Sequence, residues 1–313
     1  MFQYILVEPG ACLDGKEKFA LVMEELKKHI SGKQETLELL FLALVANGHA
    51  LLEGVPGVAK TTMTKALADT IQADFKRIQG TVDLSPEDIL GYTYRDADNE
   101  IKFKKGPIFT NILLIDELNR AQPKVMSSFL EALEERQVSV GSELLQLPSP
   151  FIAYATQNPL RIEGTEALPK VLSDRFIMRI EVGYPSIEEE QGMLRIKQGE
   201  SQEVKKILTI GDIVQMQQEA RQVTVPDNVI EYITKIVVAT RTDMHVIMGA
   251  SPRADIAFMQ TAKARAYINN RKEVIMDDIR FLARPVLSHR IAVRTTGGIG
   301  VGGIIDGILA STQ

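Results

Sequence analysis

The segment "EGVPGVAKTT" at residues 53–62 constrains the fold of this chain more than any other feature. A short apolar run, "HALLEG", leads into it, and apolar residues at helical spacing follow it, so the order is strand, loop and helix. That order is the context in which a glycine-rich loop binds phosphate. The segment departs from the strict pattern G-x-x-x-x-G-K-[ST] at one position, because Ala59 replaces the second glycine. Taken alone, it fits a phosphate loop and an ordinary glycine–proline turn equally well.

In a phosphate loop, backbone N–H groups surround a polyphosphate and the following helix directs its positive end at the same anion. Lys60 would then reach the β- and γ-phosphates, and the Thr61 hydroxyl would bind Mg²⁺. Alanine at position 59 requires a negative φ, which we expect because this position enters the helix. The candidate nucleotide-binding residues are Gly54, Val55, Pro56, Gly57, Val58, Ala59, Lys60, Thr61 and Thr62.

A second signal is "ILLIDELNR", in which Asp116 and Glu117 end a run of apolar residues. Carboxylates at the end of a buried strand carry a desolvation cost unless a cation or a partner compensates them. Asp116 is suited to hold Mg²⁺ together with Thr61, and Glu117 is suited to act as general base on a water that attacks the γ-phosphate. One such motif could be a strand that ends in solvent, but the two motifs together favour an ATP site.

Three further residues are candidates for the same site. Asn158 in "YATQNP" follows the next apolar run, where it could bind the attacking water or the γ-phosphate. On its own, an Asn-Pro pair is more often a turn. Arg175 in "SDRF" and Arg253 in "GASPRA" could stabilise the charge of phosphoryl transfer, within one subunit or from a neighbour. Without the other motifs, each would be interpreted as a surface or ion-paired arginine.

Continuous apolar runs predict a parallel sheet that is covered on both faces. Besides residues 49–54, such runs occupy residues 111–116, 151–156 and 175–182, and helical patterns lie between them. We therefore expect a doubly wound α/β domain over residues 1–185. After about Pro185 the pattern is almost entirely helical, which predicts a smaller all-α domain over residues 186–313.

Composition narrows the partners and the location. The net charge of −5 and the pI near 5.6 argue against bulk binding to nucleic acid. A single cysteine excludes an intramolecular disulfide. No apolar run approaches the roughly 20 residues of a membrane span, and the first ten residues lack a basic segment ahead of their short apolar run. We therefore expect a cytoplasmic protein without a membrane segment.

With these motifs assembled, the chain resembles the MoxR family of AAA+ ATPases over most of its length. The segments that carry the resemblance are "LLEGVPGVAKT", "FKKGPIF", "IDELNRA", "FLEALEERQV", "ATQNP", "SDRF", "GYP" and "GASPRA", in this order. The family's own phosphate loop has alanine before the lysine, so Ala59 agrees with the family. One departure is "PKVLSDRF", where relatives more often have leucine directly before the Asp-Arg pair.

The resemblance implies an α/β ATPase core with a helical lid, MgATP held between them, and assembly into hexameric rings. By position, Lys60 and Thr61 look like Walker A residues and Asn158 looks like sensor 1. Asp116 and Glu117 look like the Walker B pair. These roles are implied by the resemblance and agree with those inferred from the residue types.

For the arginines and the insert, the resemblance implies further roles. Arg175 looks like an arginine finger offered to the neighbouring subunit, and Arg253 looks like sensor 2, which reports the nucleotide state to the lid. Residues 81–109 look like the helix-2 insert of this clade, a hairpin facing the pore or a partner. Tyr92 and Tyr94 could grip a peptide there, although tyrosines that pair across the hairpin are the simpler interpretation.

The resemblance also implies a chaperone-like remodeller that matures or activates protein complexes, often with a partner that has a von Willebrand factor A domain. A chelatase-type motor subunit for metal insertion is an alternative that differs mainly in its partner. A DNA-acting AAA+ protein is disfavoured by the acidic charge and by the lack of a basic stripe interleaved with aromatic residues. A small-molecule kinase would need neither Glu117 nor Arg253.

Overall fold

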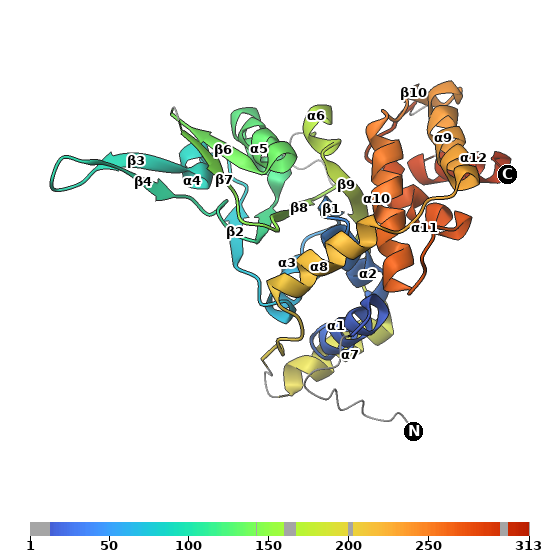
Figure 1. Cartoon of the computed structure of the whole chain (residues 1–313), viewed down its shortest axis with the longest axis horizontal. Coiled ribbons are helices and arrows are strands. Elements are labelled where there is room, and N and C mark those ends of the chain that lie inside the picture. Colours follow the sequence, from blue (N-terminus) through green and yellow to red (C-terminus); the bar gives the residue numbers. More distant parts are fainter. Residues whose placement is uncertain (1–12, 142, 160–166, 200–202, 295–299, 313) are drawn as a thin grey trace.

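The computed structural model describes residues 13–141, 143–159, 167–199, 203–294 and 300–312. At its centre, five parallel strands form a sheet in the order β2–β5–β8–β1–β9 (Figure 1). The strands are β1 (His49–Glu53), β2 (Phe75–Gln79), β5 (Ile112–Asp116), β8 (Ile152–Gln157) and β9 (Phe176–Glu181). Because they run in one direction, their carboxyl ends meet at one edge of the sheet and their amino ends at the other. The predicted doubly wound α/β fold is confirmed.

Strand β2 was not expected from the sequence, whereas the other four coincide with the predicted apolar runs to within one residue. Only Ile78 of β2 is buried, while Lys76 and Arg77 are exposed. The strand lies at the edge of the sheet and pairs with β5 alone, with Ile78 opposite Ile115. An edge strand with one buried side chain has no continuous apolar run to reveal it.

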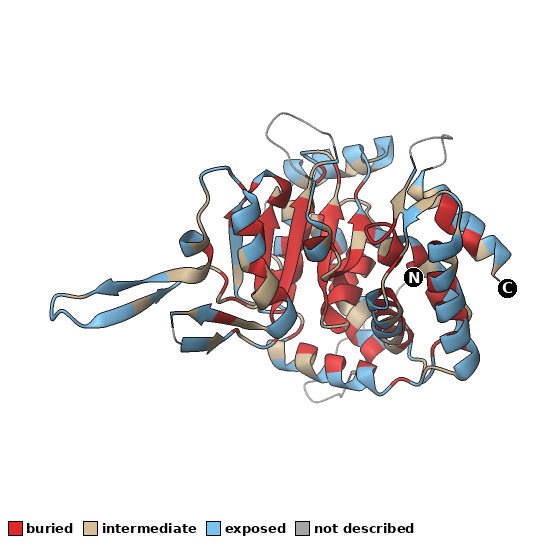
Figure 2. Cartoon of the chain, turned by 90° about the horizontal axis from the view of Figure 1, so that it is seen from above, coloured by how far each residue is buried: buried red, intermediate tan, exposed pale blue. Residues whose placement is uncertain are grey.

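Apolar side chains on the two faces of the sheet enter two separate cores. The strands at the centre of the sheet are buried along most of their length (Figure 2). Along β1, Ala50 and Leu52 belong to one core and Leu51 to the other, as strand alternation requires. The first core includes α1 (Gly15–His29), α2 (Gln34–Val45), α3 (Lys60–Thr70) and most of the C-terminal helices. The second includes α4 (Pro86–Leu90), the 3₁₀ turn η1 (Leu118–Arg120), α5 (Pro123–Glu135) and α6 (Lys170–Ser173).

The region after the sheet is helical, as predicted. Its helices are α7 (Ile187–Gln198), α8 (Ile210–Arg221), α9 (Asp227–Thr242), α10 (Arg253–Ile268), α11 (Met276–Leu287) and α12 (Val301–Ser311). A short antiparallel pair, β10 (Val246–Met248) with β11 (Ala292–Val293), joins them. Helix α10 packs against α1 and α2, and α11 packs against β9, so this region shares a core with the sheet. Every helix within the described ranges is too short or too polar to serve as a membrane span.

Two hairpins leave the sheet. One is β6 (Gln137–Val140) with β7 (Glu143–Gln146); Gly141 lies in its turn, and Ser142 lies outside the described residues. The other, β3 (Gly91–Arg95) with β4 (Ile101–Lys105), projects far from the body of the molecule (Figure 1).

The tyrosines of the projecting hairpin do not pair across it, so that interpretation was wrong. Tyr92 and Tyr94 lie on the same strand with ring centroids 6.4 Å apart, and they are opposite Lys104 and Lys102. Because residues two apart in a strand share a face, that face carries two tyrosines from β3 beside two lysines from β4. Such a face is visible only once the two strands are paired, and the linear sequence does not show it.

Candidate nucleotide-binding site

A cavity of about 310 Å³ opens at the carboxyl edge of the sheet. The loop between β1 and α3 forms one wall, and the ends of β5 and β8 form the other. The residues that line it are Pro56, Gly57, Val58, Ala59, Lys60, Thr61, Thr62, Asp116, Glu117, Thr156, Gln157 and Asn158. The structure therefore brings the loop, the acidic pair and Asn158 together, and all of the lining belongs to residues 56–158.

Two glycines and one alanine shape the loop. A Cβ at Gly54 would lie 2.4 Å from the carbonyl oxygen of Val182, so no larger residue fits there. Gly57 has a φ of +88°, in the region that favours glycine. Ala59 has a φ of +63°, so the predicted negative φ is wrong. Ala59 is the N-cap of α3, and its carbonyl oxygen accepts the first hydrogen bond of the helix, from Met63 N–H at 2.9 Å. In this left-handed conformation an alanine is strained by about 1–2 kcal/mol.

The ammonium group of Lys60 lies over the loop. Its Nζ donates hydrogen bonds to the carbonyl oxygens of Gly54 and Val55, the second at 2.9 Å. Burial lowers the pKa of Lys60, and the nearby Asp116 and Glu117 carboxylates oppose that shift. This cation lies in the first turn of α3, whose N-terminus carries positive partial charge, so this end of the cavity favours an anion.

Asp116, at the end of β5, is buried and accepts hydrogen bonds on both oxygens. Oδ1 accepts from Thr156 Oγ1 at 2.6 Å, while Oδ2 accepts from Thr61 Oγ1 at 3.2 Å and from Arg77 Nη2 at 2.7 Å. These bonds hold the carboxylate beside the Thr61 hydroxyl at the cavity wall. Hydroxyl and carboxylate oxygens are ligands that Mg²⁺ accepts, with phosphates and water completing its coordination. The residues present therefore fit a magnesium ion bound with a nucleotide.

Glu117 has a left-handed backbone, with φ of 53° and ψ of 47°. Its N–H donates to Thr156 Oγ1 at 2.8 Å. Its carboxylate Oε2 accepts from Gln79 Nε2 at 3.2 Å and from Arg120 Nη1 at 2.9 Å. Non-glycine residues in this conformation concentrate at functional sites, where surrounding contacts offset the strain. Here those contacts fix a carboxylate at the wall of the cavity.

Asn158 follows the end of β8 and lines the cavity. Its backbone carbonyl accepts a hydrogen bond from Asn119 Nδ2 at 3.3 Å. Asn158 also borders a second cavity of about 780 Å³, which lies between the end of the sheet and the segment around His289. The residue therefore stands where the loop cavity meets this second space.

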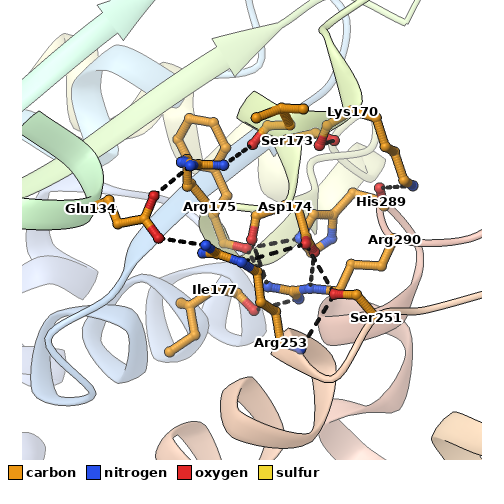
Figure 3. Close-up of polar contacts among 12 residues, drawn as sticks. Glu134, Lys170, Ser173, Asp174, Arg175, Ile177, Ser251, Arg253, His289 and Arg290 are labelled. Carbon is orange, nitrogen blue, oxygen red and sulfur yellow. Dashed lines mark hydrogen bonds and ion pairs between the residues drawn. The ribbon is translucent and has the colours of Figure 1, made fainter. Parts of the chain in front are cut away.

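Arg175 and Arg253 lie elsewhere in the described structure. Arg175 directly precedes β9, whose first residue, Phe176, is opposite His49 at the start of β1. It is thus at the amino edge of the sheet, roughly 17 Å from the loop along a five-residue strand. Arg253 begins α10 and lies beside Arg175, because both guanidinium groups donate to the carboxylate of Glu134 (Figure 3). The predicted site residues therefore form two groups, one at each edge.

Several residues that contact these two groups were not predicted, among them Arg77, Gln79, Thr156 and Glu134. Arg77 and Gln79 lie on β2, the strand that the sequence did not reveal. Thr156 could have been found, because a hydroxyl two residues before Asn158 lies on the strand next to the acidic strand end. Glu134 lies on the exposed side of α5, where a charged residue is ordinary and gives no signal.

Comparison with known proteins agrees with this geometry. A family model described as "ATPase family associated with various cellular activities (AAA)" matches residues 49–178, and an AAA lid domain model matches residues 238–298. Uncharacterized protein YeaC of Bacillus subtilis is 40% identical, with 93% of each chain covered. Chaperone MoxR1 of Mycobacterium tuberculosis is 39% identical over 86% of this chain and 74% of its own.

Two further similarities extend over the whole fold. Protein MoxR of Methylorubrum extorquens is 27% identical over 91% of both chains. A crystal structure from Cytophaga hutchinsonii, of a protein assigned as an ATPase, is 36% identical with a TM-score of 0.89, covering 96% of this chain and 95% of that one.

The chain belongs to the MoxR family of AAA+ ATPases. Its parallel sheet and helical C-terminal region are the P-loop core and the lid of the AAA+ fold. Membership of the MoxR family assigns nucleotide binding and ATPase activity at the level of the family.

Proposed function

We propose that this chain is a Mg²⁺-dependent ATPase that assembles into a homohexameric ring and uses ATP hydrolysis to remodel a protein partner. The observation that carries the proposal is the loop cavity, where Lys60, the Thr61–Asp116 pair and Glu117 face one space. That combination supplies an anion site, a magnesium site and a base, which are the three requirements of phosphoryl transfer to water.

Phosphate binding is the task of residues 54–62. The backbone N–H groups of the loop and the N-terminus of α3 would accept the polyphosphate. Lys60 would exchange its bonds to the loop carbonyls for bonds to the β- and γ-phosphates, which as charged acceptors bind an ammonium group more strongly. Thr61 and Asp116 would hold Mg²⁺, which when bound neutralises charge on the phosphates.

Glu117 would accept the proton of the attacking water. Its carboxylate is kept in place by Gln79 and Arg120, and a base must be held within hydrogen-bond reach of the proton that it removes. Asn158 would orient that water or the γ-phosphate. Thr156 keeps Asp116 and Glu117 in a fixed relation, since its hydroxyl bonds to both residues.

A ring is needed because Arg175 cannot reach the cavity of its own chain. It lies at the opposite edge of the sheet, and we propose that its guanidinium group enters the cavity of a neighbouring subunit. There it would stabilise the charge of the transferred phosphoryl group. Arg253, which bonds to the same carboxylate as Arg175, would sense the same nucleotide and report it to the lid.

The remodelling activity rests on the family. A relative that is 39% identical is named Chaperone MoxR1. We propose a chaperone-like activator of protein complexes that works in the cytoplasm with a partner bearing a von Willebrand factor A domain. The projecting β3–β4 hairpin, which corresponds to the helix-2 insert, is the element that we assign to contacts outside the ATPase core.

The first test replaces Glu117 by glutamine. We expect kcat for ATP to fall at least about 100-fold while ATP affinity changes less than about threefold, because only the proton acceptor is lost. Phosphate release and binding of a fluorescent ATP analogue measure the two quantities. Glu135→Gln is the matched control, since that carboxylate is exposed and accepts a bond from Gln137 rather than from a cavity residue. Unchanged hydrolysis in Glu117→Gln would refute the assignment.

The second test concerns the action of Arg175 on a neighbouring subunit. Arg175→Ala and Glu117→Gln should each be inactive alone. In mixed rings, a subunit with Arg175→Ala still has an intact cavity, and a neighbouring subunit with Glu117→Gln still has Arg175. The interface between these two subunits is complete, so ATPase activity should return. A mixture that is no more active than its components contradicts this role.

A further inference from the structure

Glu134 joins the two arginines at the amino edge of the sheet. It is the penultimate residue of α5, and its two carboxylate oxygens have different partners. Oε2 accepts from Arg175 Nη2 and Oε1 accepts from Arg253 Nη2 (Figure 3). These partners are 41 and 119 positions away in the sequence, so only the fold brings them to one carboxylate.

Each arginine has a second contact, and the two differ in strength. Arg175 Nη1 donates to the carbonyl oxygen of Val171 at 2.7 Å, and the Arg175 side chain is only 16% exposed. Arg253 Nε lies 4.0 Å from Asp174 Oδ2, and the Arg253 side chain is 44% exposed. Because its second contact is long and its side chain is open to solvent, Arg253 depends more on Glu134 for its position.

Figure 3 shows Glu134 and Asp174 as the carboxylates that face the guanidinium groups of Arg175, Arg253 and Arg290. The Asp174 carboxylate already accepts from Arg290, at 3.0 Å, and from Ser251, also at 3.0 Å. Glu134 is therefore the one close carboxylate that the described cluster provides for two guanidinium groups.

Two guanidinium groups repel each other, and a carboxylate between them offsets that repulsion. Hydrogen bonding from Arg253, more than any other contact, lowers the pKa of Glu134, so the carboxylate is ionised at neutral pH. The Glu134 side chain is 39% exposed, and ion pairs this exposed contribute little to folding stability. What the contacts do fix is the position of one arginine relative to the other.

We infer that Glu134 is a positioning residue: its carboxylate aligns Arg175 with Arg253 so that both guanidinium groups meet one phosphoryl anion held by the neighbouring subunit. This inference rests on the proposed function, and it adds a residue that acts only through the two arginines. With a neutral amide at position 134, repulsion separates the guanidinium groups and Arg253 turns toward solvent. The neighbour's cavity then meets Arg175 alone.

The test compares Glu134→Gln with Glu135→Gln in the full chain. For Glu134→Gln we expect kcat to fall about tenfold, the loss of one charged hydrogen bond in the transition state, with KM within about twofold. The thermal midpoint and the ring mass measured by light scattering should match those of the unaltered chain. Glu135→Gln should retain full activity, because its carboxylate lies on the same helix end without an arginine partner among the described contacts.

Mixed rings separate positioning from a structural role. Glu134→Gln mixed with Glu117→Gln should regain activity, as should Arg175→Ala mixed with Glu117→Gln, because each pair restores one complete interface. A gain only in the Arg175 mixture overturns the inference and leaves the proposed function standing. No gain in either mixture overturns both.

A double variant adds an independent criterion. If Glu134 acts through Arg253, the double variant Glu134→Gln/Arg253→Ala should be no slower than Arg253→Ala alone. If the fold-decrease in kcat of the double variant equals the product of the two single decreases, the inference is overturned. A rise in kcat for Glu134→Gln would overturn it too, because it would mean that the carboxylate restrains the arginines instead of aligning them.

Discussion

At the carboxyl edge of the sheet, Lys60, Thr61 and Glu117 face open space, whereas at the amino edge Glu134, Asp174 and the arginines bond mainly to one another. The first edge surrounds a cavity that a ligand can fill. The second is a network of hydrogen bonds and ion pairs that holds the start of β9 against α10. One sheet therefore separates the groups that bind a nucleotide from the arginines that would act on it, and a single chain cannot assemble both around one phosphate.

The largest effect should come from breaking the amino edge with Asp174→Ala. Asp174 is the carboxylate partner of Arg290, whose side chain is only 3% exposed. Removing it leaves a buried guanidinium without its counter-charge, so we expect the free energy of unfolding to fall by about 3 kcal/mol. Urea denaturation measures the change. Asp277→Ala, which removes a 72% exposed partner of Arg280, should leave stability unchanged; equal losses would mean that the cluster has no special role in holding the edge together.

Lys60→Ala should affect only the carboxyl edge of the sheet, where the nucleotide cavity lies. Loss of a charged hydrogen-bond donor to phosphate should weaken ATP binding about 10- to 100-fold, without loss of folding stability. Arg175→Ala should leave the affinity of the single chain unchanged, because Arg175 lies at the far edge. Titration with a fluorescent ATP analogue, below the concentration at which rings form, measures both. Weaker binding in Arg175→Ala would contradict the separation of the two edges.

Arg77→Gln should have a smaller effect at the carboxyl edge. Arg77 donates to Asp116 Oδ2 at 2.7 Å, and a cation there competes with Mg²⁺ for the carboxylate. The Arg77 side chain is 49% exposed, so its influence is modest, and the Mg²⁺ concentration for half-maximal activity should fall about two- to fivefold. A higher Mg²⁺ requirement would show that Arg77 orients Asp116 for the metal instead of competing with it.

The smallest effect is expected for Ala59→Gly, which relieves the left-handed strain of the loop. Glycine has no penalty at a φ of +63°, but it gains freedom in the unfolded chain, so stability should rise by at most about 1 kcal/mol. Ala239→Gly, in the last turn of α9, should lower it by up to about 1 kcal/mol. Calorimetry of the two variants should therefore give shifts of opposite sign, and shifts of the same sign would contradict the strain at Ala59.

The parts of the site that the sequence predicted are those with a local signature. Strands β1, β5, β8 and β9 are buried on both faces and appear as apolar runs, and the loop and Asp116-Glu117 follow two of these runs directly. Their common edge follows from parallel pairing. Gln79 and Arg77 were missed together with β2, because that strand has one buried side chain.

Other features depend on contacts that residue types do not specify. The sign of φ at Ala59 is set by how the loop joins α3, and a methyl group tolerates either sign at moderate cost. Glu134 appeared as one more surface charge on α5. Its role depends on Arg175 and Arg253, which are 41 and 119 positions away in the sequence and contact it only in the folded chain.

Helix α5 runs between these two edges. It starts just after the turn that follows Glu117 and ends with Glu134 and Glu135, so its 13 residues span about 20 Å. It has proline only at its first turn and no internal break. A shift of the turn at one end, as on arrival or loss of a γ-phosphate, would therefore displace Glu134 at the other end. In a ring, this helix would couple the state of each cavity to the arginine pair that meets the next cavity.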